Sequence, residues 1–146
     1  MKATLTAAII VMMSTWPAVA RLATVRERTE LSIMIASYLH NRDYGKSNPF
    51  KTDAVEIGAA VIESHFALAD WKSADGKEHG QVVFFYLCDS WNVGKVTESA
   101  FRAQDLTGRY LGDLPQEDAA KLIAELKWAE GQGVSYLKPA QPTTTC

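Results

Sequence analysis

The stretch QVVFFYLCDSW, from Gln81 to Trp91, decides the fold that this sequence predicts. Its first seven residues have the length of a typical β-strand, and the six from Val82 to Leu87 are apolar without interruption. Because successive side chains of a strand point to opposite faces, such a strand is apolar on both faces. That pattern is typical of a central strand and not of an edge strand.

The residues that follow indicate a turn and a return strand. A turn is predicted at Asp89-Ser90, and a fourth strand from Trp91 to Thr97. We expect Val96 on the face opposite to Trp91, and Gly94 at a β-bulge.

Two further strands are predicted before the central one. The first contains an alternating segment, residues 55–61, which is typical of a strand with one buried face. The second runs from His65 to Lys72, and the Asp75-Gly76 pair in the loop after it is a hairpin signal. The residues expected on the buried face of the first strand are Val55, Ile57, Ala59 and Val61.

Helices are predicted on both sides of these strands along the chain. Thr24 and Glu27 form a capping box before a helix whose apolar residues recur at three- and four-residue steps. Residues 98–113 are weakly periodic, and residues 113–130 predict a clearer helix, which Asp113 would cap. The expected core residues of the three segments are Leu31, Met34, Ile35, Tyr38 and Leu39, then Phe101, Leu106, Tyr110 and Leu111, then Ala119, Leu122, Ile123 and Leu126.

The sequence therefore predicts an α+β fold, with an N-terminal helix, a four-stranded antiparallel meander and C-terminal helices packed on one face of the sheet. The other face would then expose aromatic side chains, of which Phe84 and Tyr86 are the candidates. Trp128 lies off the apolar stripe of its helix and is a third candidate for a partner surface.

Residues 1–20 have the pattern of a signal peptide, in which Lys2 precedes an apolar segment and Ala18-Val19-Ala20 resembles a cleavage site. Cleavage after Ala20 would leave a single domain, residues 21–138, and a Pro/Thr-rich tail, residues 139–146. The apolar segment is too short to cross a bilayer, so we expect a periplasmic or secreted chain without a membrane span. Charge is nearly balanced, with 15 basic and 17 acidic residues, and shows no basic stripe of the kind that binds nucleic acid.

Cys88 and Cys146 are the two cysteines of the chain. In an oxidising compartment they could form a disulfide that holds the tail on the domain. The alternative is that Cys146 ends a mobile tail and has no intramolecular partner.

A metal site would have to use histidines that are far apart in the sequence. His65 and His79 flank the hairpin turn at residues 75–76, so they could approach each other, and copper could use Cys88 or Met34 beside them. No H-x-x-x-H or C-x-x-C spacing supports this site, and both histidines could equally be ordinary surface or half-buried residues.

Enzymatic motifs are absent from the sequence. It contains no G-x-S-x-G nucleophile elbow and no glycine-rich phosphate loop. Cys88 follows a core strand without a basic neighbour in sequence, which favours a packing or disulfide role over catalysis.

Three stretches resemble a group of small exported bacterial proteins that are associated with a copper uptake system. They are HFALADW at residues 65–71, DSWNV at residues 89–93, and LGDLPQEDAAKLIAELKWAE at residues 111–130. The resemblance implies an accessory role near metal transport. That group tends to carry a cysteine after the strand that begins with tryptophan, whereas GKVTESA at residues 94–100 has none.

The sequence thus favours a small exported, non-enzymatic accessory or binding protein, with a small ligand or a protein partner in the cell envelope and a link to copper handling. Two alternatives stay open. The protein could act through its sheet face as an envelope interaction or inhibitor protein, or it could be a hydrolase-like enzyme whose residues assemble only in three dimensions.

Overall fold

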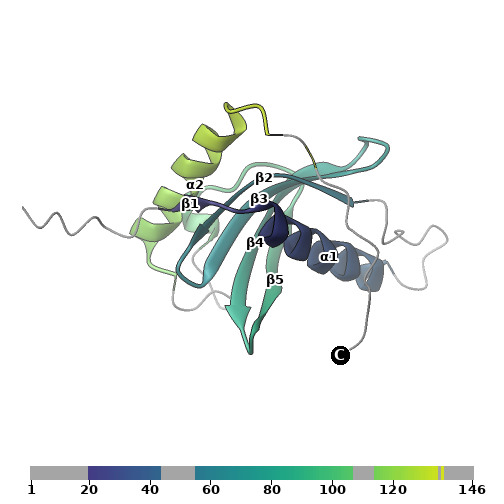
Figure 1. The fold of residues 1–146 in the computed structure, drawn as a ribbon, viewed down its shortest axis with the longest axis horizontal. Helices are drawn as coiled ribbons and strands as arrows, with labels where there is room; N and C mark the ends of the chain where they lie inside the picture. Colours follow the sequence, from purple (N-terminus) through teal and green to yellow (C-terminus); the bar gives the residue numbers. More distant parts are fainter. Residues whose placement is uncertain (1–19, 44–54, 107–113, 135, 137–146) are drawn as a thin grey trace, which may run out of the picture.

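The computed structural model describes residues 20–43, 55–106, 114–134 and 136. It has an α+β fold, as predicted, with a five-stranded antiparallel meander in the order β1-β2-β3-β4-β5 (Figure 1). The strands are β1 (Arg21–Leu22), β2 (Val55–Glu63), β3 (Phe66–Ser73), β4 (His79–Leu87) and β5 (Ser90–Thr97); the helices are α1 (Val25–Arg42), the 3-10 helix η2 (Ala103–Asp105) and α2 (Gln116–Glu130). Among the described residues, no helix is both long and apolar enough to span a membrane.

The fifth strand, β1, was not expected from the sequence. It consists of Arg21 and Leu22, which pair with Ile62 and Val61 at the end of β2. Two residues are too few to show any periodicity, so only the pairing with β2 reveals this strand.

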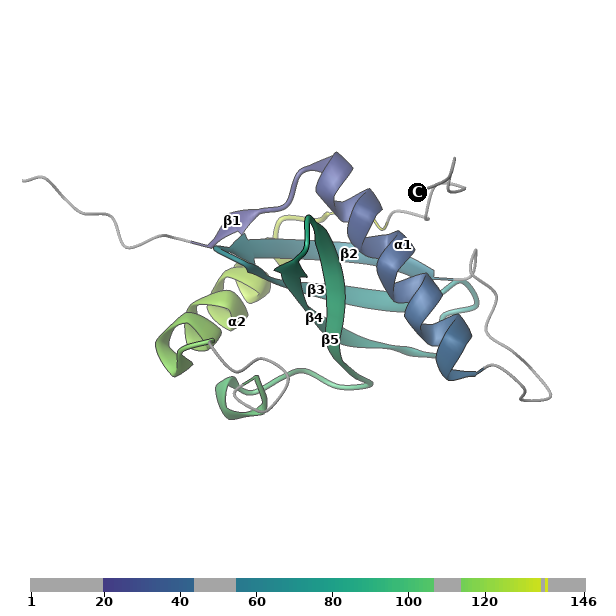
Figure 2. The same ribbon diagram turned by 90° about the horizontal axis from the view of Figure 1, so that it is seen from below.

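The two helices cover opposite faces of the sheet, so the prediction that the helices share one face is wrong. Figures 1 and 2 show the sheet passing between α1 and α2. One core cluster joins α1 to Ile57, Trp71 and Phe84, and a second joins α2 to Val61 and Leu68. Both faces of β2, β3 and β4 carry apolar side chains, and each face needs a cover to remove them from water.

A β-bulge in β2 explains why this strand has two buried faces. Ile57 pairs with Trp71 and Ala60 with Ala69, so two residues of β2 lie opposite Asp70 alone. The extra residue reverses the alternation, which places Ala60 with Ile57 on the α1 face. The predicted single buried face was therefore wrong.

A second bulge lies at Gly94, as predicted. Val83 pairs with Lys95 and Phe84 with Val93, so Gly94 has no partner in the ladder. Val96 consequently lies on the same face as Trp91, against the α1 cluster, and not on the opposite face as expected.

The N-terminal capping box is confirmed. The Glu27 backbone N–H donates to Thr24 Oγ1 at 3.2 Å, and the Thr24 N–H donates to the Glu27 carboxylate at 2.8 Å. Leu31, Ile35 and Leu39 are fully buried, whereas Tyr38, also expected in the core, is exposed.

The C-terminal region contains one α-helix and not two within the described residues. In the described part of the weakly periodic segment, residues 98–106, the short η2 is the only helix, and Phe101 and Leu106 are buried as predicted. Helix α2 follows Pro115, and Ala119, Leu122 and Leu126 form its buried face. Tyr110 and Leu111 were expected in the core and Asp113 as the helix cap; all three lie outside the described residues.

Candidate functional site

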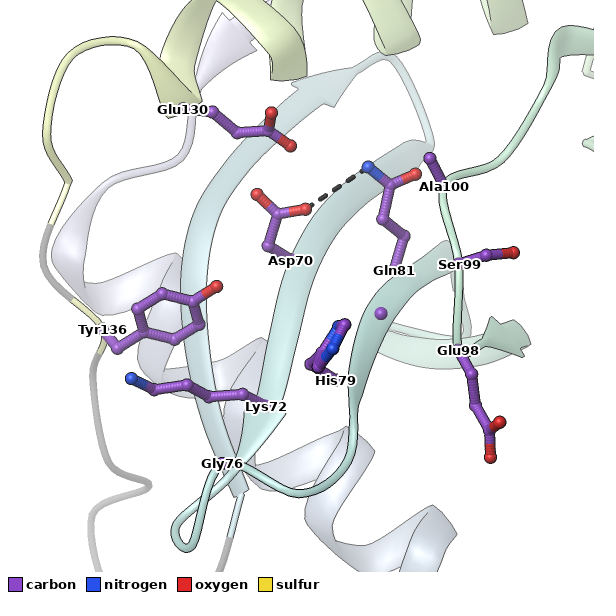
Figure 3. A pocket seen from close by; sticks show the side chains of 11 residues that line it. Asp70, Lys72, Gly76, His79, Gln81, Glu98, Ser99, Ala100, Glu130 and Tyr136 are labelled. Atoms are coloured by element: carbon purple, nitrogen blue, oxygen red, sulfur yellow. Dashed lines mark hydrogen bonds between the residues drawn. The ribbon is translucent and has the colours of Figure 1, made fainter.

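A pocket of about 580 Å³ lies where β3, β4, the segment after β5 and the end of α2 meet (Figure 3). We call it the polar pocket. It is lined by Asp70, Lys72, Gly76, His79, Gly80, Gln81, Glu98, Ser99, Ala100, Glu130 and Tyr136. The β2 bulge lies directly opposite Asp70, so the irregularity in the sheet is next to a residue that lines the pocket.

Gln81 fixes the position of Asp70. Its side-chain oxygen accepts a hydrogen bond from the Phe101 N–H at 2.8 Å, and its amide nitrogen donates to Asp70 Oδ1 at 3.3 Å. Since one end of the amide is held by the backbone, the other end must present its N–H₂ group to the carboxyl group.

Asp70 and Glu130 form a carboxyl pair within the polar pocket. Figure 3 shows the Glu130 side chain, at the end of α2, directed toward Asp70 on β3. Burial and the neighbouring Glu130 carboxyl raise the pKa of Asp70 to about 7, and Gln81 opposes the shift. A second carboxyl group beside Asp70 disfavours its ionised form, so Asp70 keeps its proton to a much higher pH than an ordinary aspartate does.

Tyr136 and Lys72 form the wall next to the pair. Lys72 Nζ lies 4.3 Å from the centre of the Tyr136 ring and 3.5 Å from Glu56 Oε2. The ring packs on Gly58, where an added Cβ would lie only 2.7 Å from Tyr136 Cζ. A glycine in the β2 bulge therefore allows the ring to close this side of the pocket.

This arrangement can accept hydrogen bonds from a ligand, or it can transfer a proton. A carboxyl group with a pKa near 7 is suited to general acid–base chemistry as well as to binding amines or hydroxyl groups. The pocket thus fits the binding protein and also the hydrolase-like alternative that the sequence left open.

The two histidines predicted to hold a metal do not meet. His79 pairs with Lys72 at one end of β3, whereas the His65 carbonyl accepts from the Tyr86 N–H at the other end. The length of β3 between them is about 20 Å at 3.3 Å per residue, so one ion cannot bind both imidazoles. The described residues contain no group of three or more His, Cys, Asp or Glu side chains arranged to bind a metal.

Cys88 lies in the turn between β4 and β5. Leu87 pairs with Ser90, so the turn residues are Cys88 and Asp89, one position earlier than predicted, and both have positive φ angles, 54° and 60°. The Cys88 side chain is exposed, and it has no disulfide partner among the described residues. Cys146 lies outside them, so the disulfide stays a prediction.

The three residues predicted as a partner surface do not form one. Phe84 is fully buried, because its face of the sheet is covered by α1. Tyr86 and Trp128 are exposed, at 41% and 53%, but Tyr86 packs edge-on against Trp91 on the α1 face and Trp128 belongs to α2 on the other.

The sequence patterns did not predict the polar pocket. They place Asp70 at the end of a strand, where a turn needs a polar residue, and they single out none of Gln81, Glu130 and Tyr136. An acidic residue flanked by apolar residues within a strand, as in LADWK, was the signal that could have indicated Asp70.

Comparison of this chain with protein-family models, curated proteins and solved structures finds no match. The resemblance to the copper-associated proteins therefore stays a prediction.

Proposed function

We propose that this protein is an exported, non-enzymatic binding domain that holds a small polar ligand in the polar pocket. The observation that carries the proposal is the Asp70–Glu130 carboxyl pair, placed in a concave site of about 580 Å³. Ligand pockets characteristically combine an apolar wall with a few convergent polar groups. Here the Tyr136 ring is the wall, and Asp70, Gln81 and Glu130 are the polar groups.

The chemistry of the pair favours a ligand that carries an amine or several hydroxyl groups. At neutral pH Asp70, with a pKa of about 7, holds its proton only about half of the time, so the pair carries negative charge and can accept hydrogen bonds from such groups. The neighbouring Lys72 amine is engaged by Glu56 and Tyr136, which reduces its competition for the pair.

Titration of the isotope-labelled mature protein with ethylenediamine and with glycerol, followed by amide NMR shifts, tests the proposal. We expect shifts at the pocket residues that saturate, and a weaker response in Asp70→Asn. Glu117→Gln, which changes an exposed carboxylate of α2, is the matched control. Absence of any pocket shift with both probes, together with no small molecule retained in native mass spectrometry of untagged protein, would rule the proposal out.

The link to copper rests on the sequence resemblance alone. Oxygen ligands such as those of Asp70 and Glu130 suit hard cations better than copper(I). Metal analysis of untagged protein purified from the periplasm tests this link, since stoichiometric copper supports it and its absence removes it.

A second candidate function is contact with an envelope protein through the end of the sheet where the β2–β3 and β4–β5 turns lie. Four large apolar side chains are exposed near this end, namely Leu22, Val25, Tyr86 and Leu87, beside a pocket of about 520 Å³. Grouped exposed apolar residues are typical of interaction surfaces. A photo-crosslinking residue at position 87 should give one discrete adduct in the periplasm that is missing with the same residue at position 117; equal labelling at both positions would exclude this surface.

A further inference from the structure

Helix α2 rests on the sheet between two contacts of the same unusual kind. In its first turn, Asp118 faces Glu63 at the end of β2, and its last residue, Glu130, faces Asp70 on β3. The apolar side chains between these contacts pack on the sheet, and they are Ala119, Leu122, Leu126 and Ala129. Each end of the helix thus places a carboxyl group against a carboxyl group of the sheet.

The contact at the first turn is the more buried of the two. Glu63 is 5% exposed, and its Oε2 atom has no hydrogen-bond partner among the described residues. Within the part of the chain that the structure describes, the charged groups that act on it belong to α2: Asp118, Lys121 and Glu125. Burial is the main cause that raises the pKa of Glu63; Asp118 and Glu125 raise it further, and Lys121 opposes them.

The contact at the last turn opens onto the polar pocket. Glu130 is the charged group that acts on Asp70, and Lys72, His79, Glu98 and Tyr136 are the other titratable groups that line the same pocket. Lys72 is directed toward Tyr136 and Glu56 and not toward the carboxyl pair.

We propose that protons shared within the Glu63–Asp118 and Asp70–Glu130 pairs hold α2 on the sheet, and that loss of these protons as the pH rises loosens the helix and widens the polar pocket. With a proton, each pair forms a carboxyl–carboxylate hydrogen bond; without it, two negative charges face each other in a partly buried place. This inference does not depend on what the pocket binds.

The direction of the pH effect follows from the sign of the shifts. The folded state holds these protons more tightly than the unfolded chain does, so protonation favours the docked helix. The stabilisation is complete below the ordinary pKa of a carboxyl group. This stabilisation is lost as the pH rises through the pKa values that the carboxyl groups have in the folded state. For Asp70 this pKa is about 7.

Hydrogen–deuterium exchange of the full mature chain between about pH 5 and pH 8 tests the proposal. After correction for the intrinsic exchange rate, we expect the protection factors of α2 amides to fall about tenfold from the lower to the higher pH. A factor of ten corresponds to a difference of one pKa unit between the docked and the loosened helix. The protection of α1 amides, which contact neither pair, should stay constant. Equal protection of α2 at both pH values in the wild-type chain would overturn the proposal without the need for any variant.

The double variant Glu63→Gln/Asp70→Asn provides the second arm. Each new amide can donate a hydrogen bond to Asp118 or Glu130 at any pH, and the new side-chain oxygen at position 70 can still accept from Gln81. We therefore expect α2 protection to be high and independent of pH in the double variant. Glu117→Gln, on the exposed side of the first turn, should keep the wild-type pH dependence. A tenfold fall that persists in the double variant would show that other groups cause it.

Discussion

Replacement of Gly58 by alanine should destabilise the protein only while Tyr136 is present. The Cβ added at position 58 would lie 2.7 Å from Tyr136 Cζ, so the ring must leave its place on the β2 bulge. The backbone itself accepts alanine, because Gly58 is not among the described glycines with positive φ, which are Gly76 and Gly133.

The magnitude follows from the area that the ring loses. Tyr136 is 39% exposed. A tyrosine side chain has an accessible area of about 200 Å², so its packing removes roughly 120 Å² of surface from water. At about 25 cal/mol per Å² this is about 3 kcal/mol, as an upper bound. Release of the side chain and its backbone returns about 1–2 kcal/mol of conformational entropy. We expect Gly58→Ala to lower the free energy of unfolding by about 1–2 kcal/mol.

In a Tyr136→Ala background the same substitution should change sign. No ring then opposes the new methyl group, and alanine restricts the unfolded chain more than glycine does, which stabilises by about 0.4–1 kcal/mol. Urea unfolding of the wild type, both single variants and the double variant gives the four free energies of a double-mutant cycle. If Gly58→Ala costs the same in both backgrounds, the bulge backbone and not the ring sets the cost, and our reasoning is wrong.

Three further predictions concern the core and the N-terminal cap. Phe84→Ala should lower the free energy of unfolding by about 3–5 kcal/mol in urea titrations, because Phe84 is in the core. Tyr86 is half-exposed, so Tyr86→Ala should lower it by about 1 kcal/mol or less. Arg28→Met should cost about 2 kcal/mol by the same assay, because the buried guanidinium donates to the carbonyls of the β2 bulge at 3.0 and 3.4 Å; a stabilised variant would show that desolvation of the charge outweighs these bonds. The hydrogen bonds from Arg21 lower the pKa of Glu27 from 4.5 to about 2. The ionised carboxylate therefore stabilises the folded protein above the ordinary pKa, and this stability is lost as the pH falls through the folded-state pKa. In thermal melts, the melting temperature of Glu27→Gln should fall less over this pH range than that of the wild type.

The local elements could be predicted because each depends on neighbours in the sequence. The capping box depends only on Thr24 and Glu27, three residues apart. The division of β3 and β4 residues between the two faces of the sheet follows from the strand period alone. The bulge at Gly94 was also visible, since a glycine within a strand pattern is an uncommon local signal.

The faces of the sheet could not be predicted in the same way. A bulge at residues 58–59 reverses the alternation of β2, and the alternation alone had favoured a single buried face. Once both faces of β2 are apolar, helices must cover both, and this change buries Phe84.

The sequence by itself determined the class of fold, the order of α1, the four longer strands and α2, and the central place of the stretch from Gln81 to Leu87, because periodicity and turn chemistry are local properties of the chain. Only the tertiary structure decided that His65 and His79 lie apart and that Asp70, Gln81, Glu130 and Tyr136 lie together. Strand register and helix docking bring together residues that are far apart in the sequence, and the pKa shift of Asp70 arises from burial and from Glu130, a distant residue along the chain.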